Sequence, residues 1–103
     1  MADYNAASRK KLYQAVLRLK SIEECERFFE DLCTIREITD MAQRLEAAVL
    51  LDRKVSYQSI AKQVGISTAT IGRVSKCLYY GAGGYRLALD RMQSEEEANG
   101  SEA

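Results

Sequence analysis

The feature that most constrains the fold is the segment 57–76, which has the pattern of a helix-turn-helix. Two short helices that cross at a fixed angle need a small residue at their contact, and Ala61 stands there. The turn between them needs a residue that accepts positive φ, and Gly65 supplies it. The apolar residues of the pattern fall on the inner face of both helices: Ile60, Val64, Ile66, Ile71 and Val74. The segment therefore predicts helices over 57–64 and 68–79, joined by a tight turn.

The outer face of the second helix carries small, hydroxylated and basic residues, which a helix in the DNA major groove can use. Thr68, Ala69 and Gly72 are expected closest to base edges, and the hydroxyls of Ser67 and Thr70 can hydrogen-bond to phosphates or bases. A glycine at position 72 costs the helix about 1 kcal/mol relative to alanine, which either close approach of DNA or close helix packing would explain. The predicted DNA-binding residues are Gln58, Lys62, Ser67, Thr68, Ala69, Thr70, Gly72, Arg73 and Lys76.

The charge of the chain is segregated, although its formal net charge is zero. Residues 1–20 hold five Lys/Arg against one Asp, and residues 53–91 hold seven against one. Residues 21–52 instead hold three Lys/Arg against nine Asp/Glu, and the segment after Met92 adds four Glu. The helix-turn-helix therefore lies in a basic part of the chain, as a DNA-binding surface requires.

The other segments also predict helices, so the expected fold class is all-α with six helices. Apolar residues recur with the helical period over residues 8–20, 22–33, 35–52 and 85–92. A chain of 103 residues forms one domain, here expected over residues 1–93. The N-cap candidates are Ser21, Thr34, Ser56 and Ser67.

The residues 94–103 are rich in Glu and contain no aliphatic side chain larger than Ala, so a disordered acidic tail is expected there. The helices before it have more apolar surface than so short a chain can bury alone. A homodimer is the simplest solution, and a helical monomer is the alternative. The core predicted for the dimer includes Leu12, Val16, Leu19, Phe28, Phe29, Leu32, Ile38 and Leu45.

The sequence resembles the Trp-repressor-like family, in its YerC branch. The resemblance covers residues 10–93, is closest over Val55–Leu78, and includes the shared signature of Ala69-Thr-Ile and Arg73. It implies six helices, an intertwined homodimer and a DNA-reading unit formed by the fourth and fifth helices. The positions that contact DNA in the family fall here on Gln58, Ser67, Thr68, Ala69, Thr70, Gly72 and Arg73.

The family's corepressor, tryptophan, binds between two arginines, and this sequence departs from that pattern. Arg73 matches the second arginine, whereas Gln43 stands at the first unless a one-residue shift brings Arg44 there. Val74 replaces a glycine that leaves room for the indole. The loss of one cation and the added β-branched side chain are expected to abolish the pocket, so tryptophan is not the expected effector, and any effector is unknown.

The expected function is that of a homodimeric transcriptional regulator, a repressor, that binds operator double-stranded DNA. The alternative is a helical protein-interaction module in which the helix-turn-helix is only a packing unit. Large apolar residues on the outer face of the second helix would favour that alternative, and the sequence has none there. Without histidine or a phosphate-binding glycine loop, an enzyme is not expected.

No cofactor or metal is expected either. The three cysteines, Cys25, Cys33 and Cys77, have no histidine partner and form no Cys-x-x-Cys pair. They are interpreted as reduced thiols of a cytoplasmic, nucleoid-associated protein. The sequence has no run of 18 apolar residues, so no membrane span is expected.

Overall fold

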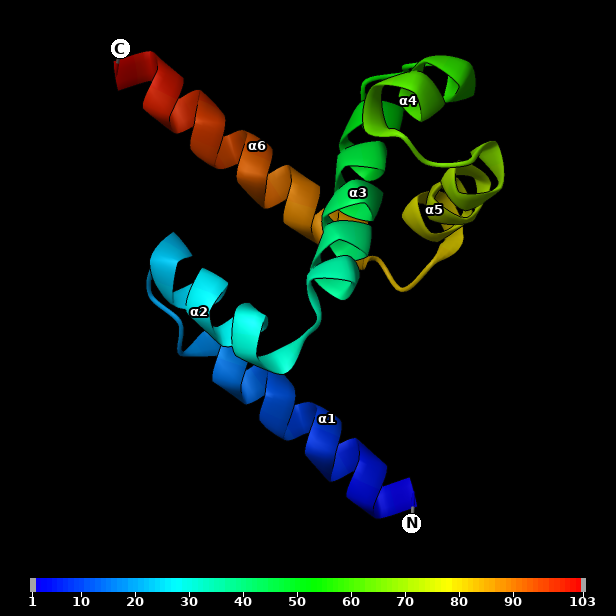
Figure 1. The fold of residues 1–103 in the computed structure, drawn as a ribbon. Coiled ribbons are helices and arrows are strands. Elements are labelled where there is room, and N and C mark those ends of the chain that lie inside the picture. The colour runs from blue at the N-terminus through cyan, green and yellow to red at the C-terminus, as the bar shows by residue number, and fades with distance from the viewer. Residues whose placement is uncertain (1, 103) are drawn as a thin grey trace. The chain divides into compact units, whose positions relative to one another are not determined.

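The protein is built of helices throughout the described part of the chain (Figure 1). The computed structural model describes residues 2–102, and the side chains of residues 5–98. The helices are α1 (Ala2–Leu17), α2 (Ile22–Leu32), α3 (Ile35–Asp52), α4 (Tyr57–Val64), α5 (Thr68–Tyr80) and α6 (Gly84–Glu102). Residues 2–102 contain no strand, which confirms the predicted all-α class with six helices.

The first helix begins and ends earlier than the sequence predicts. We expected residues 8–20, but α1 starts at Ala2, because the alanine-rich segment before Ser8 contains no residue that breaks a helix. At its other end the N–H groups of Arg18 and Leu19 donate to carbonyls three residues back, each at 3.1 Å. This tightening closes the helix before residue 20.

The last helix was also predicted too short. It was expected to end at residue 92, yet α6 continues to Glu102. Residues 93–98 contain neither Gly nor Pro that would end it, and Gly100 lies within the helix. The exposed Glu side chains at 95–97 continue the helix without packing into the core. Disorder of the acidic tail over 94–103 stays a prediction, and residue 103 lies outside the described residues.

Hydroxyl side chains cap four of the helices, as predicted. The Oγ of Ser21, Ser56 and Ser67 and the Oγ1 of Thr34 each accept a hydrogen bond from the backbone N–H three residues on, at 3.1 to 3.2 Å. Each bond satisfies one N–H that has no partner within the helix. These caps set the starts of α2, α3, α4 and α5 at or within one residue of the expected positions.

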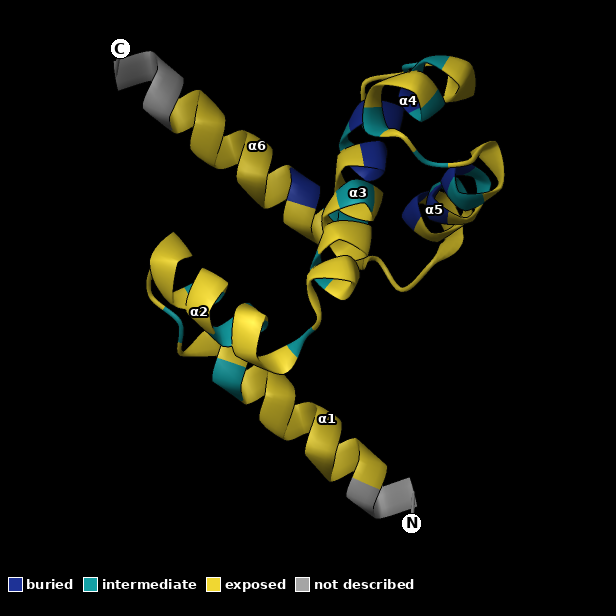
Figure 2. Ribbon diagram, viewed as in Figure 1, coloured by how far each residue is buried: buried dark blue, intermediate teal, exposed yellow. Residues whose placement is uncertain are grey.

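The chain divides into two compact units, residues 1–38 and 39–103. The second unit contains the hydrophobic core, drawn in dark blue in Figure 2. Its buried residues are Ala47, Ala48, Leu50, Leu51, Ile60, Ile71, Val74, Leu78 and Leu89. Val64 and Ile66 pack against this cluster, so the apolar face predicted for the helix-turn-helix is confirmed.

The first unit buries none of the side chains that the structure describes in it. In α2 the rings of Phe28 and Phe29 meet edge to face, with centroids 5.6 Å apart, and both remain half-buried. Two other apolar side chains are open to solvent, with Leu17 at 83% and Ile35 at 81% exposure. These helices thus carry an apolar surface that is left uncovered within their own unit.

A bidentate ion pair fixes the start of α6 against the end of α3. Arg86 donates from its two terminal nitrogens to both carboxylate oxygens of Asp52, at 2.8 and 2.9 Å, and also pairs with Asp90 at 2.8 Å. The hydrogen bonds from Arg86 lower the pKa of Asp52, and those to the two carboxylates raise the pKa of Arg86. Among the described residues, no helix is long and apolar enough to cross a lipid bilayer.

Candidate nucleic-acid interface

The geometry of the helix-turn-helix begins with its turn. Gly65 ends α4 in the left-handed region at φ 81°, and its N–H donates to the carbonyl of Ala61 at 2.9 Å. A β-carbon would be strained at this φ, which is why the turn needs glycine. Ile60 on α4 and Ile71 on α5 are fully buried and fix the two helices against the core.

Five predicted contact residues form one face of α5. Thr68, Ala69, Arg73 and Lys76 are exposed, and Gly72 is half-buried between them. Their spacings of three and four residues place them on the same side of the helix. We call these five residues the outer face of α5. The face is small and polar at its N-terminal end and basic towards its C-terminal end.

Gly72 has no packing role in the described structure. A β-carbon built on it meets no neighbouring heavy atom within 4 Å. Close helix packing, one of the two explanations for this glycine, therefore lacks support. The space beside Gly72 is open, so another molecule can approach the backbone of α5 at this position.

Ser67 and Thr70, predicted to hydrogen-bond to phosphates or bases, are hydrogen-bonded to each other in the structure. Ser67 caps α5, and its Oγ is also 3.0 Å from the Oγ1 of Thr70. Thr70 is half-buried and faces α3, where it lines a cavity. Thr70 is thus turned towards the cavity, whereas Ser67 is exposed directly before the outer face of α5. On α4, by contrast, both predicted contact residues, Gln58 and Lys62, are exposed.

Lys54 and Tyr79 were not among the predicted site residues. Lys54 lies in the turn before α4 at φ 65°, and its Nζ is 5.6 Å from the ring centroid of Tyr79 at the end of α5. The pairing joins positions 25 residues apart, so no local sequence pattern could reveal it. The sequence showed only that a basic residue precedes the helix-turn-helix and that an aromatic residue stands at the end of its second helix.

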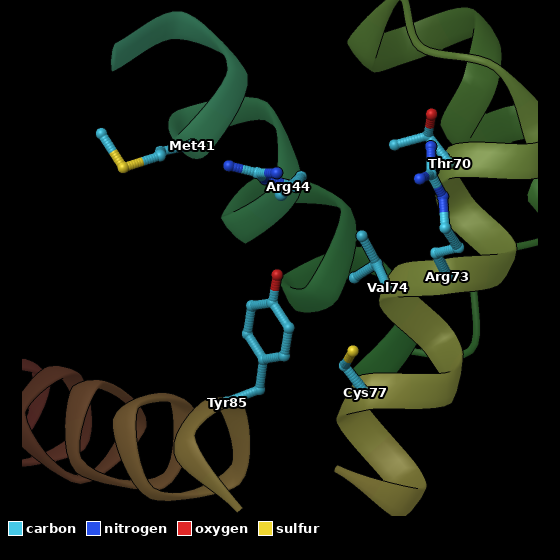
Figure 3. A pocket seen from close by; sticks show the side chains of 7 residues that line it. All are labelled: Met41, Arg44, Thr70, Arg73, Val74, Cys77 and Tyr85. Carbon is cyan, nitrogen blue, oxygen red and sulfur yellow. The ribbon is translucent and has the colours of Figure 1, made fainter. Parts of the chain in front are cut away.

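A cavity of about 430 Å³ lies between α3, α5 and α6 (Figure 3). Two guanidinium groups line it, Arg44 from α3 and Arg73 from α5, and Tyr85 of α6 points into the same space. The remaining lining residues are Met41, Thr70, Val74 and Cys77. The sequence had left open whether Gln43 or Arg44 takes the place of the first arginine, and it is Arg44 that lines this cavity. The absence of tryptophan binding stays a prediction.

Gln43 and Arg44, the two candidates for the first arginine position, have different contacts. The amide of Gln43 donates to the carbonyl of Val64 at 3.3 Å, which ties α3 to the end of α4. Gln43 does not line the 430 Å³ cavity, whereas Arg44 does. Both residues line a smaller neighbouring pocket together with Thr70 and Arg73. Val74 does line the cavity as expected, but its side chain is only 3% exposed and narrows the space without filling it.

Comparisons with known proteins agree with this fold. The family model described as Trp repressor protein matches residues 7–93. The uncharacterized protein YerC of Bacillus subtilis (strain 168) is 50% identical over 91 residues, 88% of each chain. A TrpR-like protein from Eubacterium eligens ATCC 27750 superposes with a TM-score of 0.82 at 44% identity, over 84% of this chain and 90% of that one. A Trp repressor-related structure from Staphylococcus aureus gives 0.81 at 42% identity, over 84% and 87%.

Proposed function

Because the chain belongs to the Trp repressor family, in its YerC-type branch, we propose that it is a sequence-specific DNA-binding transcriptional regulator. The outer face of α5 carries this proposal. It offers hydroxyl, methyl and cationic groups with no large apolar side chain among Thr68, Ala69, Gly72, Arg73 and Lys76. A helix in the major groove needs such groups, and the fold holds them on a rigid scaffold.

The proposed contacts divide into two kinds. Thr68 and Ala69 are nearest the N-terminal end of α5 and read base edges, including the methyl group of thymine. Arg73 and Lys76, together with Gln58 and Lys62 on α4, hold the phosphate backbone. Ser67 orients the first turn of α5 through its cap, and Thr70 supports that cap.

The regulator acts as a homodimer in this proposal. The support is the apolar surface of the first unit, where Leu17, Ile22 and Ile35 are exposed and no described side chain is buried. A second copy would cover this surface and repeat the helix-turn-helix. Two symmetric copies of α5 would then read half-sites about one DNA turn apart, about 34–36 Å.

The mode of regulation proposed is repression by occupation of an operator, and the place of action is the cytoplasmic nucleoid. Catalysis has no part in it, since the family is one of regulators and the chain has no histidine. A ligand between Arg44 and Arg73 would alter the position of α5 relative to α3. Tryptophan is not the proposed ligand, because Val74 occupies part of that space.

The test is selection of binding sites from a random DNA pool at a fixed salt concentration. We expect an enriched motif with two-fold symmetry and half-sites one turn apart. Recovery of no enriched sequence, with the folded protein on the beads, would contradict sequence-specific binding. An enriched site without symmetry would contradict the dimer and leave the reading role of α5 intact.

A protein-interaction module is the second candidate, and Tyr80 favours it. This side chain is 87% exposed at the end of α5, and an exposed aromatic is a frequent anchor of protein interfaces. Under this alternative, Tyr80→Ala would remove binding to a protein partner while leaving the selected DNA site, if there is one, bound normally.

A further inference from the structure

One cation beside α5 comes from a different part of the chain. Lys54 stands in the turn between α3 and α4, and its Nζ lies 5.6 Å from the ring centroid of Tyr79. This distance is within the range at which an ammonium is attracted to the face of an aromatic ring. The ring therefore holds the end of a flexible side chain at a defined place near the C-terminus of α5.

That place lies on the side of α5 that carries its outer face. Tyr79 follows Thr68 by eleven residues, which is three helical turns plus about 20°. Gly72 and Lys76 lie between them on the same stripe. Tyr79, whose ring Lys54 contacts, is thus about 16 Å along the helix axis from Thr68, at the far end of the face that we propose to enter the groove.

Lys54 forms no ion pair with a carboxylate of the described residues, although, besides the hydrogen bonds from Arg86, its charge acts on Asp52 from a longer distance and helps to lower the pKa of that carboxyl. The nearest carboxylate in the sequence is Asp52, and both of its oxygens are taken by Arg86, at 2.8 and 2.9 Å. Across residues 5–98 the ion pairs that form all involve Arg86. Lys54 is also exposed, so its ammonium is open to an anion from outside.

The backbone of Lys54 is better suited to glycine than to lysine. Its N–H donates to the carbonyl of Leu51 at 2.9 Å, and the next N–H, of Val55, donates to Leu50 at 3.1 Å. These two bonds form the motif that ends α3 and that usually has glycine in the left-handed position. Lysine at φ 65° is strained there. A side chain retained in spite of backbone strain points to a use outside the helix cap.

We infer that Lys54 is a further DNA-contacting residue, whose ammonium, seated on Tyr79, binds a backbone phosphate at the edge of the groove that α5 enters. The inference rests on the proposed DNA binding. The N-terminal residues of a recognition helix meet base edges, so its far end approaches the phosphates that flank the groove. Lysine binds such a phosphate as a point charge, and Tyr79 positions it for this contact.

The test measures affinity for a random-sequence duplex over a series of salt concentrations, because a phosphate contact is independent of sequence. Lys54→Gly should make the slope of log K against log salt shallower by about 0.9 per contact, which is about an eightfold loss per contact at 0.1 M salt. The temperature of unfolding should stay the same or rise, since glycine relieves the strain at φ 65°. Lys54→Arg, which keeps the charge, and Tyr79→Phe, which keeps the ring face, should bind as the wild type does. Arg91→Ala, on α6, is the control for the loss of one positive charge.

Four results would separate the possibilities. An unchanged slope for Lys54→Gly, with wild-type binding intact, overturns the inference alone. An equal change for Arg91→Ala overturns it too, because the effect would then be one of net charge. Weaker binding with a lower unfolding temperature and an unchanged slope would assign Lys54 a structural role. Failure of the wild-type protein to bind any duplex would remove the proposed function itself.

Discussion

Replacing Gly72 with alanine should stabilise the protein and weaken DNA binding at the same time. The added β-carbon meets no heavy atom within 4 Å, so it neither clashes nor packs. What changes in the folded protein is the helix propensity of α5, which favours alanine by about 1 kcal/mol at an interior position. For a domain of this size that gain raises the unfolding temperature by about 4 to 8 °C. Thermal unfolding followed by circular dichroism measures it.

The same methyl group should reduce affinity for the selected site. Gly72 lies between Thr68 and Lys76 on the outer face of α5, where we propose that DNA approaches the backbone. Loss of close approach at one base step costs about 1 to 3 kcal/mol, which is at least a fivefold decrease in affinity. Titration of labelled duplex at constant salt gives this number.

Gly84→Ala is the matched control for both measurements. A β-carbon there also meets nothing within 4 Å, but the residue begins α6 and is not part of α5. We expect it to leave DNA affinity unchanged. A stabilised Gly72→Ala protein that binds the selected site as tightly as the wild type would refute the placement of DNA against position 72. A destabilised one would refute the packing argument.

The remaining predictions concern the contacts, the dimer, the pocket and the ion pair. Arg73→Ala should weaken binding to all duplexes alike and flatten the salt dependence, whereas Thr68→Val should reduce only binding to the selected site; competition titrations with random duplex separate the two. Sedimentation at micromolar concentration should give twice the 11.6 kDa chain mass, and a compact monomer would exclude the dimer. Calorimetric titration with tryptophan should give no saturable signal; a signal that strengthens in Val74→Ala would instead identify the cavity as its site. The pKa of Asp52 is lowered in the folded state, so its carboxylate stabilises the fold above the unfolded pKa of about 3.9. This stabilisation is lost as the pH falls through the lower folded pKa. Asp52→Asn should therefore lower the free energy of unfolding by about 1 kcal/mol at pH 7 and by less near pH 3.

The sequence predicted best those features that local chemistry determines. An N-cap depends only on the hydroxyl side chain and the backbone N–H three residues later, and the turn at Gly65 depends only on the φ of that residue. The helix-turn-helix core follows from a spacing within a single segment, and Ile60, Ile71 and Val74 are buried as expected. Helix ends without a cap or breaker were predicted poorly. No cap or breaker marks the start of α1 at Ala2 or the end of α6 at Glu102.

Features that depend on two distant segments could not be predicted in this way. The ion pair between Asp52 and Arg86 joins residues 34 apart, and the seat of Lys54 on Tyr79 joins 25. Both depend on how α3 lies against α5 and α6, which no spacing within one helix encodes. The open space beside Gly72 could not be predicted for the same reason. A glycine within a helix gives the same sequence pattern whether another helix or empty space lies beside it.

The pocket illustrates how a correct resemblance can still mislead about a single side chain. Matching residues one by one assigns the first cationic wall to Gln43, but an α-helix turns by 100° per residue, so adjacent positions face different neighbours. Gln43 donates to Val64 and, with Arg44, lines a smaller pocket beside Arg73, whereas of the two only Arg44 lines the larger cavity. Two guanidinium groups, those of Arg44 and Arg73, thus line the cavity, although Arg44 is not the residue that an ungapped match places at the first arginine position. Val74 and Tyr85 also line it, and the ring of Tyr85 lies towards Arg44 (Figure 3). A ligand that fits must carry enough negative charge to bind two guanidinium groups. It must also be smaller than one that would fit if position 74 were glycine. If such a ligand draws Arg73 towards Arg44, it removes a phosphate contact from the outer face of α5, and ligand binding and DNA binding would then oppose each other.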